Sequence, residues 1–473
     1  MPEIEGFTCW RSDGVQGGRR KPEPILPEDI LYQIHALMPM KDAACASTVS
    51  RGFLRSWHCY PNLVFNSKTF GINEDTPNNI NEITSDFIGR VDHIMTNHSG
   101  TGVKKFKLQT YPCDNLHLSY VDRWLQVATA PGIEEFELQM PWCNKIEYNF
   151  PCSLLSTERG SSLQSFVLDH CAFHPAAEVG CLSSLTSVHL SSVHITAEEL
   201  CSFLSKSLAL KQLDIYRCND IVCLKIPYEL SHLNFLAVQD CVMLEMIESD
   251  APKLSQFKYI GHPIDITTKS NMLYCARTKL PSIAPNVQTL FLTSLDEKVN
   301  TPMLAVKFLY LKHLEIVLVE PSLSPDYDFC SLASFLDGSP SLDTLILHVE
   351  VPTIREDSIL EFSDYNSYHS RQILQHSNKN LRNVTITGFC SAKSMIEFTN
   401  DILAHAPVLE CLVLDTSRGH ERKIHKSTMC LHMFEEDLVE VQRARMAIER
   451  HVVGNVPSTV NLKVLEPCSK CLS

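Results

Sequence analysis

The sequence predicts an α/β fold in which three short N-terminal helices precede an irregular curved solenoid with a parallel sheet on its concave face. Two observations support this prediction. One spacing of apolar residues recurs twelve times between residues 103 and 414 of the 473-residue chain. In addition, residues 26–57 carry helical apolar stripes interrupted by proline. A chain of this length exceeds one simple core, so several units or one repeat array are expected.

Composition and charge narrow the classes of function. The formal net charge of −14 argues against a nucleic-acid binder, which needs a basic surface to displace counterions from phosphates. No apolar run reaches the roughly 18 residues of a membrane span, and residues 1–25 lack the apolar core of a signal peptide. We therefore expect no membrane partner and an intracellular location in the nucleus, the cytoplasm or both. The 19 cysteines are then expected to be reduced thiols that mostly pack as small hydrophobes.

The N-terminal part divides into a tail, a helical unit and a connector. Residues 1–24 are polar and predict a flexible tail, with an import signal at Arg19 to Lys21 as the alternative to a solvated cluster. Residues 25–65 predict three helices, because Pro27 suits a first helical turn and apolar residues follow at helical spacing. Residues 66–100 are weakly patterned and are assigned to a connector.

Residues 101–434 are predicted to form about twelve leucine-rich repeats. Each repeat carries the spacing apolar-x-x-apolar-x-apolar, at intervals of 21 to 39 residues. The last two apolar positions lie two apart and so face one side of a short strand, and stacked strands then share one core. The twelve copies start at Val103, Ile133, Leu163, Leu185, Leu210, Leu233, Leu254, Val287, Leu311, Leu342, Leu381 and Leu409.

The remaining parts of the repeats are more variable. Cys171, Cys218 and Cys241 follow their strands by three residues, where such repeats usually carry Asn or Cys. Residues 195–207 and 392–406 predict helices, whereas the other connections suggest irregular turns. The last segment, residues 435–473, predicts a helix and a tail. The apolar face of this helix, expected to cover the open end of the array, holds Leu438, Val441, Ile448 and Val452.

The segment from Leu26 to Trp57 resembles the F-box. It departs from plant relatives at Gly52-Phe53, where they usually carry a basic residue and Trp, and it lacks the common Asp before Leu-Pro. Residues 119–138 and 148–156 add a resemblance to the plant F-box/leucine-rich-repeat family with FBD-like repeats, so that the likeness spans about residues 26–455. The matching F-box positions are Leu26-Pro27, Ile30-Leu31, Ile34, Met38-Pro39-Met40, Asp42-Ala43, Ser47, Val49-Ser50-Arg51 and Trp57.

The resemblance implies a substrate receptor of an SCF-type cullin–RING ubiquitin ligase. The F-box would dock on a Skp-type adaptor, and through it on the cullin–RING ligase, while the repeats bind an unidentified protein substrate. No cofactor is expected, and no catalytic signature such as GxSxG, HExxH or GxxxxGK[ST] occurs. The adaptor-binding candidates are Leu26, Pro27, Ile30, Leu31, Ile34, Pro39, Val49 and Trp57.

Three alternatives stay open at this point. The helical unit could be a plain cap on the repeats, which leaves the order of Leu-Pro, Pro39 and Ser-Arg unexplained. The chain could be a leucine-rich-repeat scaffold with a vestigial F-box, for which Gly52 and Phe53 are the best support. A thiol-transfer ligase is the enzymatic alternative, but no cysteine stands in a recognisable activating context.

The strand positions between the apolar ones are expected to point out of the concave face. These twelve residues have no single charge sign, and Phe235, also on this face, adds to its apolar members. The twelve are Lys107, Glu137, Val167, His189, Asp214, Ala237, Lys258, Phe291, Glu315, Ile346, Thr385 and Val413. The substrate-binding candidates among them are His189, Asp214, Lys258, Phe291, Glu315 and Ile346.

No metal site is expected. Cys468 and Cys471 form a single CxxC, and His425, Cys430 and His432 are too few for the four ligands of structural zinc. The basic segment 418–426 is assigned to a solvated loop, with anion binding as the alternative.

Overall fold

The computed structural model describes residues 26–72, 80–113, 116–129, 131–142, 147–156, 160–175, 179–261, 272–294, 297, 301, 306–319, 327–349, 357–361, 373–417, 433 and 435–467. The chain divides into two compact units, Met1–Leu210 and Lys211–Ser473, and each is described by itself.

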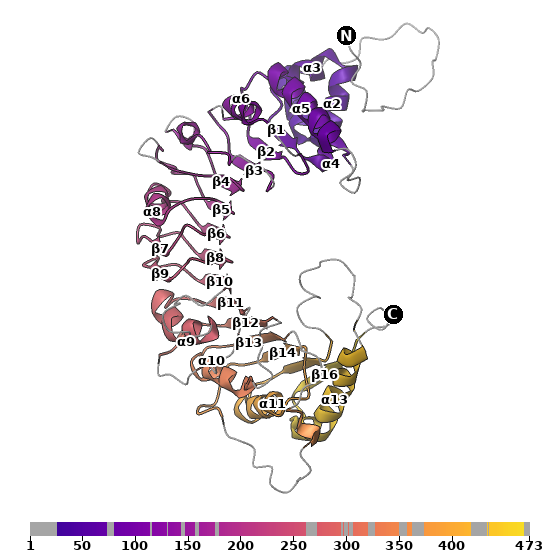
Figure 1. The fold of residues 1–473 in the computed structure, drawn as a ribbon, viewed down its shortest axis with the longest axis vertical. Coiled ribbons are helices and arrows are strands. Elements are labelled where there is room, and N and C mark those ends of the chain that lie inside the picture. The colour runs from indigo at the N-terminus through magenta and orange to yellow at the C-terminus, as the bar shows by residue number, and fades with distance from the viewer. Residues whose placement is uncertain are drawn as a thin grey trace, which may run out of the picture. The chain divides into compact units, whose positions relative to one another are not determined.

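The N-terminal unit begins with three helices and continues as a parallel sheet with the order β1-β2-β3-β4-β5 (Figure 1). Its helices are α1 (Glu28–Leu37), α2 (Met40–Val49), α3 (Arg51–Trp57), α4 (Ser67–Phe70), α5 (Ile80–Asn97), α6 (Leu118–Ala128), the 3₁₀ turn Cys152–Leu155 and α8 (Ala197–Ser205). Its strands are β1 (Asn62–Phe65), β2 (Lys105–Gln109), β3 (Glu135–Gln139), β4 (Ser165–Asp169) and β5 (Ser187–Ser191).

The C-terminal unit holds a longer parallel sheet with the order β6-β8-β10-β11-β12-β13-β14-β15-β16, and β7 and β9 pair in a small second sheet. The main strands are β6 (Gln212–Tyr216), β8 (Phe235–Gln239), β10 (Gln256–Gly261), β11 (Thr289–Ser294), β12 (His313–Leu318), β13 (Thr344–Val349), β14 (Asn383–Thr387), β15 (Cys411–Asp415) and β16 (Asn461–Leu465). The outer layer contains β7 (Cys223–Ile226), β9 (Met246–Ser249), α9 (Met272–Ile283), α10 (Ala333–Asp337), α11 (Lys393–His405) and α13 (Glu435–His451), together with the 3₁₀ turns Phe329–Leu332, Ile359–Glu361 and Val453–Asn455.

The predicted fold class is confirmed, because each of the twelve apolar motifs forms a strand of a parallel sheet. Besides β7 and β9, two strands of the main sheets were missed. At β1 the motif is present as Tyr60, Leu63 and Phe65, but it was counted with the helical unit. At β16 the polar Thr459 occupies the first apolar position, so Leu462 and Val464 alone did not match the pattern.

The core lies between the sheet and the outer elements, and aromatic side chains stack along it in the N-terminal unit. Phe106, Phe136 and Phe166 are fully or almost fully buried at equivalent positions of three repeats. Their successive ring centroids are 5.8 and 5.7 Å apart. No single repeat could bury such a ring, so this stack makes the repeats stable only as an array.

Several strands end in the same backbone conformation. His170, Arg217 and Asp240 have φ near 50°, a left-handed conformation that turns the chain out of the strand. The N–H of His170 donates to Ser191 O at 3.0 Å, and Arg217 and Asp240 donate in the same way to the next strand. The following cysteines, Cys171, Cys218 and Cys241, are buried as predicted.

Two expectations for the outer layer were wrong. Helices α6 and α9 form where irregular turns were predicted. Helix α9 contains Pro281, which cannot donate a backbone hydrogen bond to the carbonyl four residues earlier, and the helix ends soon after it at Ile283. In α13, Ile448 is buried as predicted but Leu438 and Val441 are only half-buried, because Ala444, Ala447 and the polar Glu440 form much of the buried face. Glu440 accepts the Ser391 N–H at 2.7 Å, an interaction that apolar spacing cannot reveal.

Helix α13 packs against α11 rather than over the sheet end. Asn400 Nδ2 donates to His451 O at 2.9 Å, which joins the two helices. Within the described residues β16 is the terminal strand, and its Leu465 remains 40% exposed.

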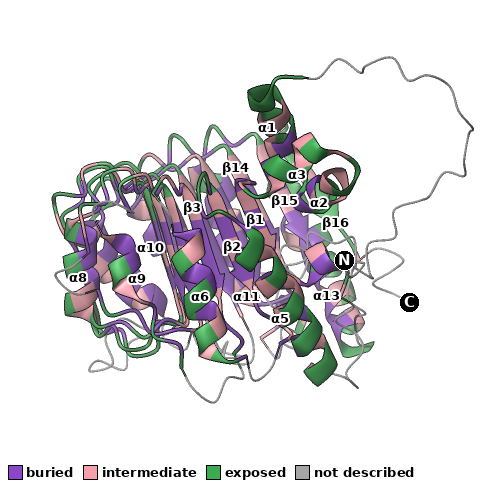
Figure 2. Ribbon diagram, turned by 90° about the horizontal axis from the view of Figure 1, so that it is seen from above, coloured by how far each residue is buried: buried purple, intermediate pink, exposed green. Residues whose placement is uncertain are grey.

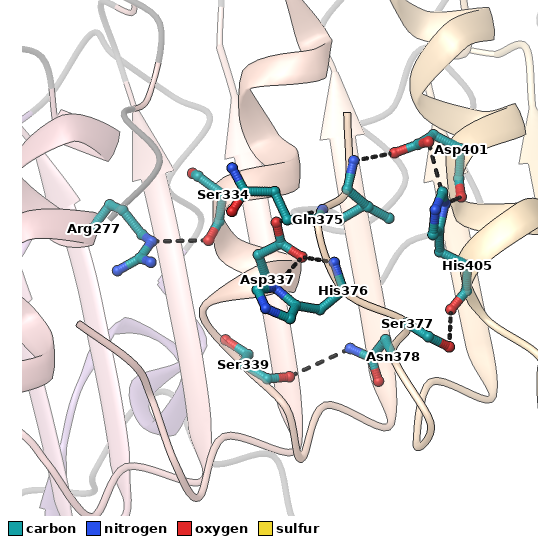
Figure 3. Close-up of polar contacts among 11 residues, drawn as sticks. Arg277, Ser334, Asp337, Ser339, Gln375, His376, Ser377, Asn378, Asp401 and His405 are labelled. Atoms are coloured by element: carbon teal, nitrogen blue, oxygen red, sulfur yellow. Dashed lines mark hydrogen bonds and ion pairs between the residues drawn. The ribbon is translucent and has the colours of Figure 1, made fainter. Parts of the chain in front are cut away.

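A polar network joins the outer segments of successive repeats in the C-terminal unit (Figure 3). The buried Arg277 on α9 donates through Nε to Ser334 O at 2.9 Å. One repeat further, Asp337 on α10 accepts the backbone N–H groups of Gln375 and His376 at 2.9 and 3.1 Å. Helix α10 has only five residues and residues 373–378 form no helix, so these bonds link neighbouring repeats where little helix packing is available.

Candidate adaptor-binding surface and concave face

Helices α1, α2 and α3 form a unit whose prolines set its boundaries. Pro27 and Pro39 precede the first residues of α1 and α2 with φ of −53° and −56°, so the ring conformation fits a helix start. Ser50 precedes α3 in extended backbone, and its hydroxyl makes no capping bond there.

The interior of this unit is small and aromatic. His35 is 1% exposed, and its ring lies 5.2 Å from that of Phe53 and 5.5 Å from that of Tyr60. His35 Nε2 lies 2.8 Å from Ala43 O and joins α1 to α2, while its Nδ1 is buried without a hydrogen-bond partner. Trp57 completes the cluster, 5.3 Å from Tyr60.

Most predicted adaptor-binding residues lie outside this interior (Figure 2). Leu26, Ile30 and Ile34 are 45%, 37% and 37% exposed on or beside α1. Val49 is 78% exposed at the end of α2, and Pro27 and Pro39 are exposed as well. Leu31 and Trp57 are half-buried and contact residues of the unit itself. Leu31 and Trp57 therefore also contribute to the interior of the unit. The sequence did not distinguish this structural role from a role in docking.

Two further apolar residues of the three-helix unit are exposed to solvent. Leu37 is 87% exposed at the end of α1, and Leu54 is 45% exposed on α3. Leu37 continues the helical spacing of Ile30 and Ile34. This spacing could have identified Leu37 as an adaptor-binding candidate. Leu54 follows the Gly52-Phe53 departure, and no apolar spacing in the sequence identified it as a candidate.

The Gly52-Phe53 departure lies at the inner side of α3. A Cβ at Gly52 would approach Leu31 Cδ1 to 2.8 Å, so the glycine lets α1 and α3 pack closely. The Phe53 ring packs against the His35 ring at an interplanar angle of 51°. The departure thus changes how the unit packs internally and leaves the exposed apolar residues of α1 in place.

Helix α1 and the turn after it are hydrogen-bonded to the start of the sheet. Tyr60 Oη donates to Met38 O at 2.7 Å, and Asn62 Nδ2 donates to Ala36 O at 2.8 Å. The buried His98 reaches the same junction, where its Nε2 lies 3.0 Å from Tyr60 O and its Nδ1 accepts the Gly100 N–H at 3.0 Å. Burial lowers the pKa of His98, partly offset by the bond to Tyr60, so the neutral ring is favoured.

The strand residues predicted to face outward fall into one register in each unit. In the N-terminal unit the row is Lys107, Glu137, Val167 and His189. In the C-terminal unit it is Asp214, Ala237, Lys258, Phe291, Glu315, Ile346, Thr385 and Val413, continued by Lys463 of β16. The exact alignment follows from the parallel pairing, which repeats the motif position on every strand.

Exposure differs along these rows. Among the predicted substrate-binding residues, His189, Asp214, Lys258, Phe291 and Ile346 are of intermediate burial. Glu315 is only 7% exposed, although it lies in the same row. His313 and His348 flank it, with ring nitrogens 3.9 and 3.7 Å from its carboxylate. The role of the six residues in substrate binding stays a prediction.

Three parallel Lys–Glu pairs cross between β2 and β3. The Nζ atoms of Lys104, Lys105 and Lys107 lie 2.7, 2.6 and 2.5 Å from carboxylate oxygens of Glu134, Glu135 and Glu137. The segments VKKFKL and IEEFEL therefore complement each other position by position.

The searched residues contain no group of three or more His, Cys, Asp or Glu side chains arranged to hold a metal ion. The candidate clusters at Cys468 and Cys471, at His425, Cys430 and His432, and at residues 418–426 lie outside the described residues, as does the tail 1–25. Among the described helices, none has the length and apolar character needed to cross a membrane.

Comparison with known proteins identifies the family. The leucine-rich-repeat domain of the At1g61320/AtMIF1 type matches residues 94–469. The F-box/LRR-repeat protein At3g58940 of Arabidopsis thaliana is 23% identical over 283 residues, which cover 57% of this chain and 45% of that protein. The F-box/FBD/LRR-repeat protein At1g13570 of the same plant is 22% identical over 409 residues, covering 83% of this chain and 90% of that protein.

Coverage differs among these relatives. The chain spans 38% of At3g42770, another relative from Arabidopsis thaliana, at 27% identity. An internalin from Listeria monocytogenes matches 84% of this chain and 96% of its own with 13% identity, and at a TM-score of 0.28 it adds nothing to the fold seen in the strands. The domain match and these relatives place the chain in the plant F-box/leucine-rich-repeat family.

Proposed function

We propose that this protein is a substrate receptor of an SCF-type cullin–RING ubiquitin ligase. The three-helix unit would dock on a Skp-type adaptor, and the repeats would bind a protein substrate. One observation carries the proposal. The unit encloses only a small interior around His35 and leaves Leu26, Ile30, Ile34, Leu37, Val49 and Leu54 exposed. A structural cap would instead turn such side chains toward the repeats.

Burial of these side chains supplies the driving force for docking. Each square ångström of apolar surface removed from water contributes roughly 25 cal/mol, before the cost of association is subtracted. Leu37 and Val49, at 87% and 78% exposure, have the most surface to lose. They are therefore expected to be energetic anchors of the interface.

The junction with β1 supports a positioning role. Tyr60 and Asn62 tie the backbone of α1 and the turn after it to the start of the sheet at 2.7 and 2.8 Å. A substrate on the concave face of the N-terminal unit would therefore be held in a defined relation to the adaptor. Ubiquitin transfer would be accelerated by proximity of the substrate lysine to the charged conjugating enzyme.

The chain itself is proposed to be non-catalytic and to need no cofactor. Burial raises the pKa of Cys241 to about 11 and also raises that of Cys59, so at these two positions the thiolate that a thiol-transfer ligase needs is disfavoured. The relatives carry the name F-box/LRR, which fits a receptor subunit. We further propose an intracellular location, in the nucleus, the cytoplasm or both, and no nucleic-acid or membrane partner.

A pull-down with a purified Skp-type adaptor tests the proposal. Ile30→Asp combined with Ile34→Asp should reduce capture at least tenfold, because both charges would be buried in the interface. Val453→Asp in the C-terminal unit, 46% exposed in the wild type, is the matched control and should leave capture unchanged. Circular dichroism establishes that the variants fold. Lack of capture of the folded wild type would favour the scaffold with a vestigial F-box instead.

A further inference from the structure

An exposed apolar patch lies on the outer face of the C-terminal unit, opposite the concave face. It consists of Val222, Cys223, Val242, Met243 and Met246, and we call it the methionine patch. Val222, Val242, Met243 and Met246 are 44%, 45%, 52% and 45% exposed, and Cys223 is half-buried. None of these residues belongs to the adaptor surface or to the concave rows.

Two neighbouring repeats bring these residues together. Cys223 and Met246 are register partners of the small sheet formed by β7 and β9. The carbonyl of Val222 accepts the N–H groups of Glu245 and Met246 at 2.8 and 3.3 Å. The turn that carries Val242 and Met243 is fixed by a bond from Val242 N–H to Asn219 Oδ1 at 3.1 Å.

The patch exists because this part of the outer layer is built from strands. In Figure 1, β7 and β9 lie on the opposite side of the core from β6, β8 and β10, where other repeats of the unit carry α9, α10 and α11. Leu224, Ile226 and Ile247 point into the core and are at most 2% exposed. The alternate residues of the two strands must then face solvent, and Met246 is one of them.

The charges around the patch are mainly acidic. Glu245 and Glu248 are exposed within or beside β9, and Asp250 follows that strand. Asp220 and Glu229 add two exposed carboxylates from the repeat that contains β7. Lys225 is a nearby cation, and it lies 3.4 Å from Glu248.

We propose that the methionine patch binds a basic amphipathic helix of a partner protein. Flexible thioethers adapt to varied apolar side chains, and methionine is enriched at protein interfaces. The acidic frame complements lysine and arginine along the flanks of such a helix and disfavours an acidic one. The partner would therefore occupy a surface separate from both adaptor and substrate, whether or not the ligase role holds.

The full chain should be titrated with two synthetic helical peptides that share one apolar face, one with lysine and one with glutamate on the polar face. Fluorescence anisotropy should show binding of the lysine peptide and at least tenfold weaker binding of the glutamate peptide. Met243→Glu combined with Met246→Glu should weaken the lysine peptide at least tenfold. Met446→Glu on α13, where the wild-type residue is 41% exposed, should not.

Three results would overturn the proposal. These are no binding of the lysine peptide to the wild type, equal binding of both peptides, or binding that the double substitution leaves unchanged. Sedimentation velocity distinguishes another occupant, because dimerisation that the double substitution abolishes would assign the patch to a second copy of the chain. Cooperative thermal unfolding of the double variant near the wild-type midpoint shows that any lost binding is local.

Discussion

Lys107 on β2 and Glu137 on β3 form an ion pair of 2.5 Å on the concave face, where Glu137 also accepts Gln109 Nε2 at 2.8 Å. Their side chains are only 31% and 10% exposed, so solvent screens this pair less than a surface pair. Since β2 carries lysine wherever β3 carries glutamate at the paired positions, the two repeats match each other in charge as well as in apolar spacing.

Reversal of this pair is expected to destabilise the N-terminal unit. Lys107→Glu places a second carboxylate against the nearly buried Glu137 and should lower the free energy of unfolding by on the order of 2 kcal/mol. The double variant Lys107→Glu/Glu137→Lys should recover part of that loss. Chemical denaturation of the wild type, Lys107→Glu, Glu137→Lys and the double variant measures the coupling, and strictly additive effects would contradict a direct interaction.

His98 should make the junction between the helices and the sheet sensitive to acid. Its folded-state pKa is lowered, so the unfolded chain takes up the proton first as the pH falls below about 6.5. Stability should therefore decline from that pH downward, and protonation of Nδ1 would remove the acceptor for the Gly100 N–H. In His98→Gln the decline should be shallower, by at most about 1.4 kcal/mol per pH unit. If the free energies of unfolding of the two proteins fell in parallel between pH 7 and pH 5, this role of His98 would be contradicted.

Arg277 and Gly338 are expected to depend on each other. A Cβ at residue 338 would lie 2.7 Å from Arg277 Nη2, and it would also meet Ser334 O at 3.0 Å. Gly338→Ala should therefore disturb the bonds that Arg277 makes with Ser334 O and Val306 O at 2.9 and 2.7 Å. Arg277→Met leaves both carbonyls without this donor and should cost about 3 kcal/mol. In the double variant the cost should be less than the sum, as measured by thermal unfolding.

Leu37 is expected to contribute to adaptor binding although it was not among the sequence candidates. Leu37→Asp should weaken capture by a Skp-type adaptor about tenfold or more, since its 87% exposed side chain would carry a charge into an apolar interface. Leu309→Asp, at a wild-type exposure of 55%, is the control in the other unit. Equal capture of both variants would place Leu37 outside the interface.

The sequence alone determined the repeat architecture and located the three-helix unit that is proposed to dock on the adaptor. Twelve recurrences of one spacing were enough, because the position of an apolar residue in a strand decides which face it takes. The same spacing predicted that Phe291, Ile346 and their equivalents lie in one row, and the strand pairing confirms this row. The F-box resemblance indicated α1 to α3, and the helices begin where the prolines predict.

Tertiary structure alone decided which side chains those elements leave in contact with solvent. Glu315 shares a row with Phe291 yet is buried between His313 and His348, and Glu440 is buried because it binds Ser391 N–H. The methionine patch arises only because β7 and β9 replace helices in the outer layer, which local spacing did not show. Burial depends on what the neighbouring repeats place around a side chain. The hydrogen-bond partners of Arg277, Glu440 and Cys241 lie 57, 49 and 26 residues away in sequence, beyond the reach of a local pattern.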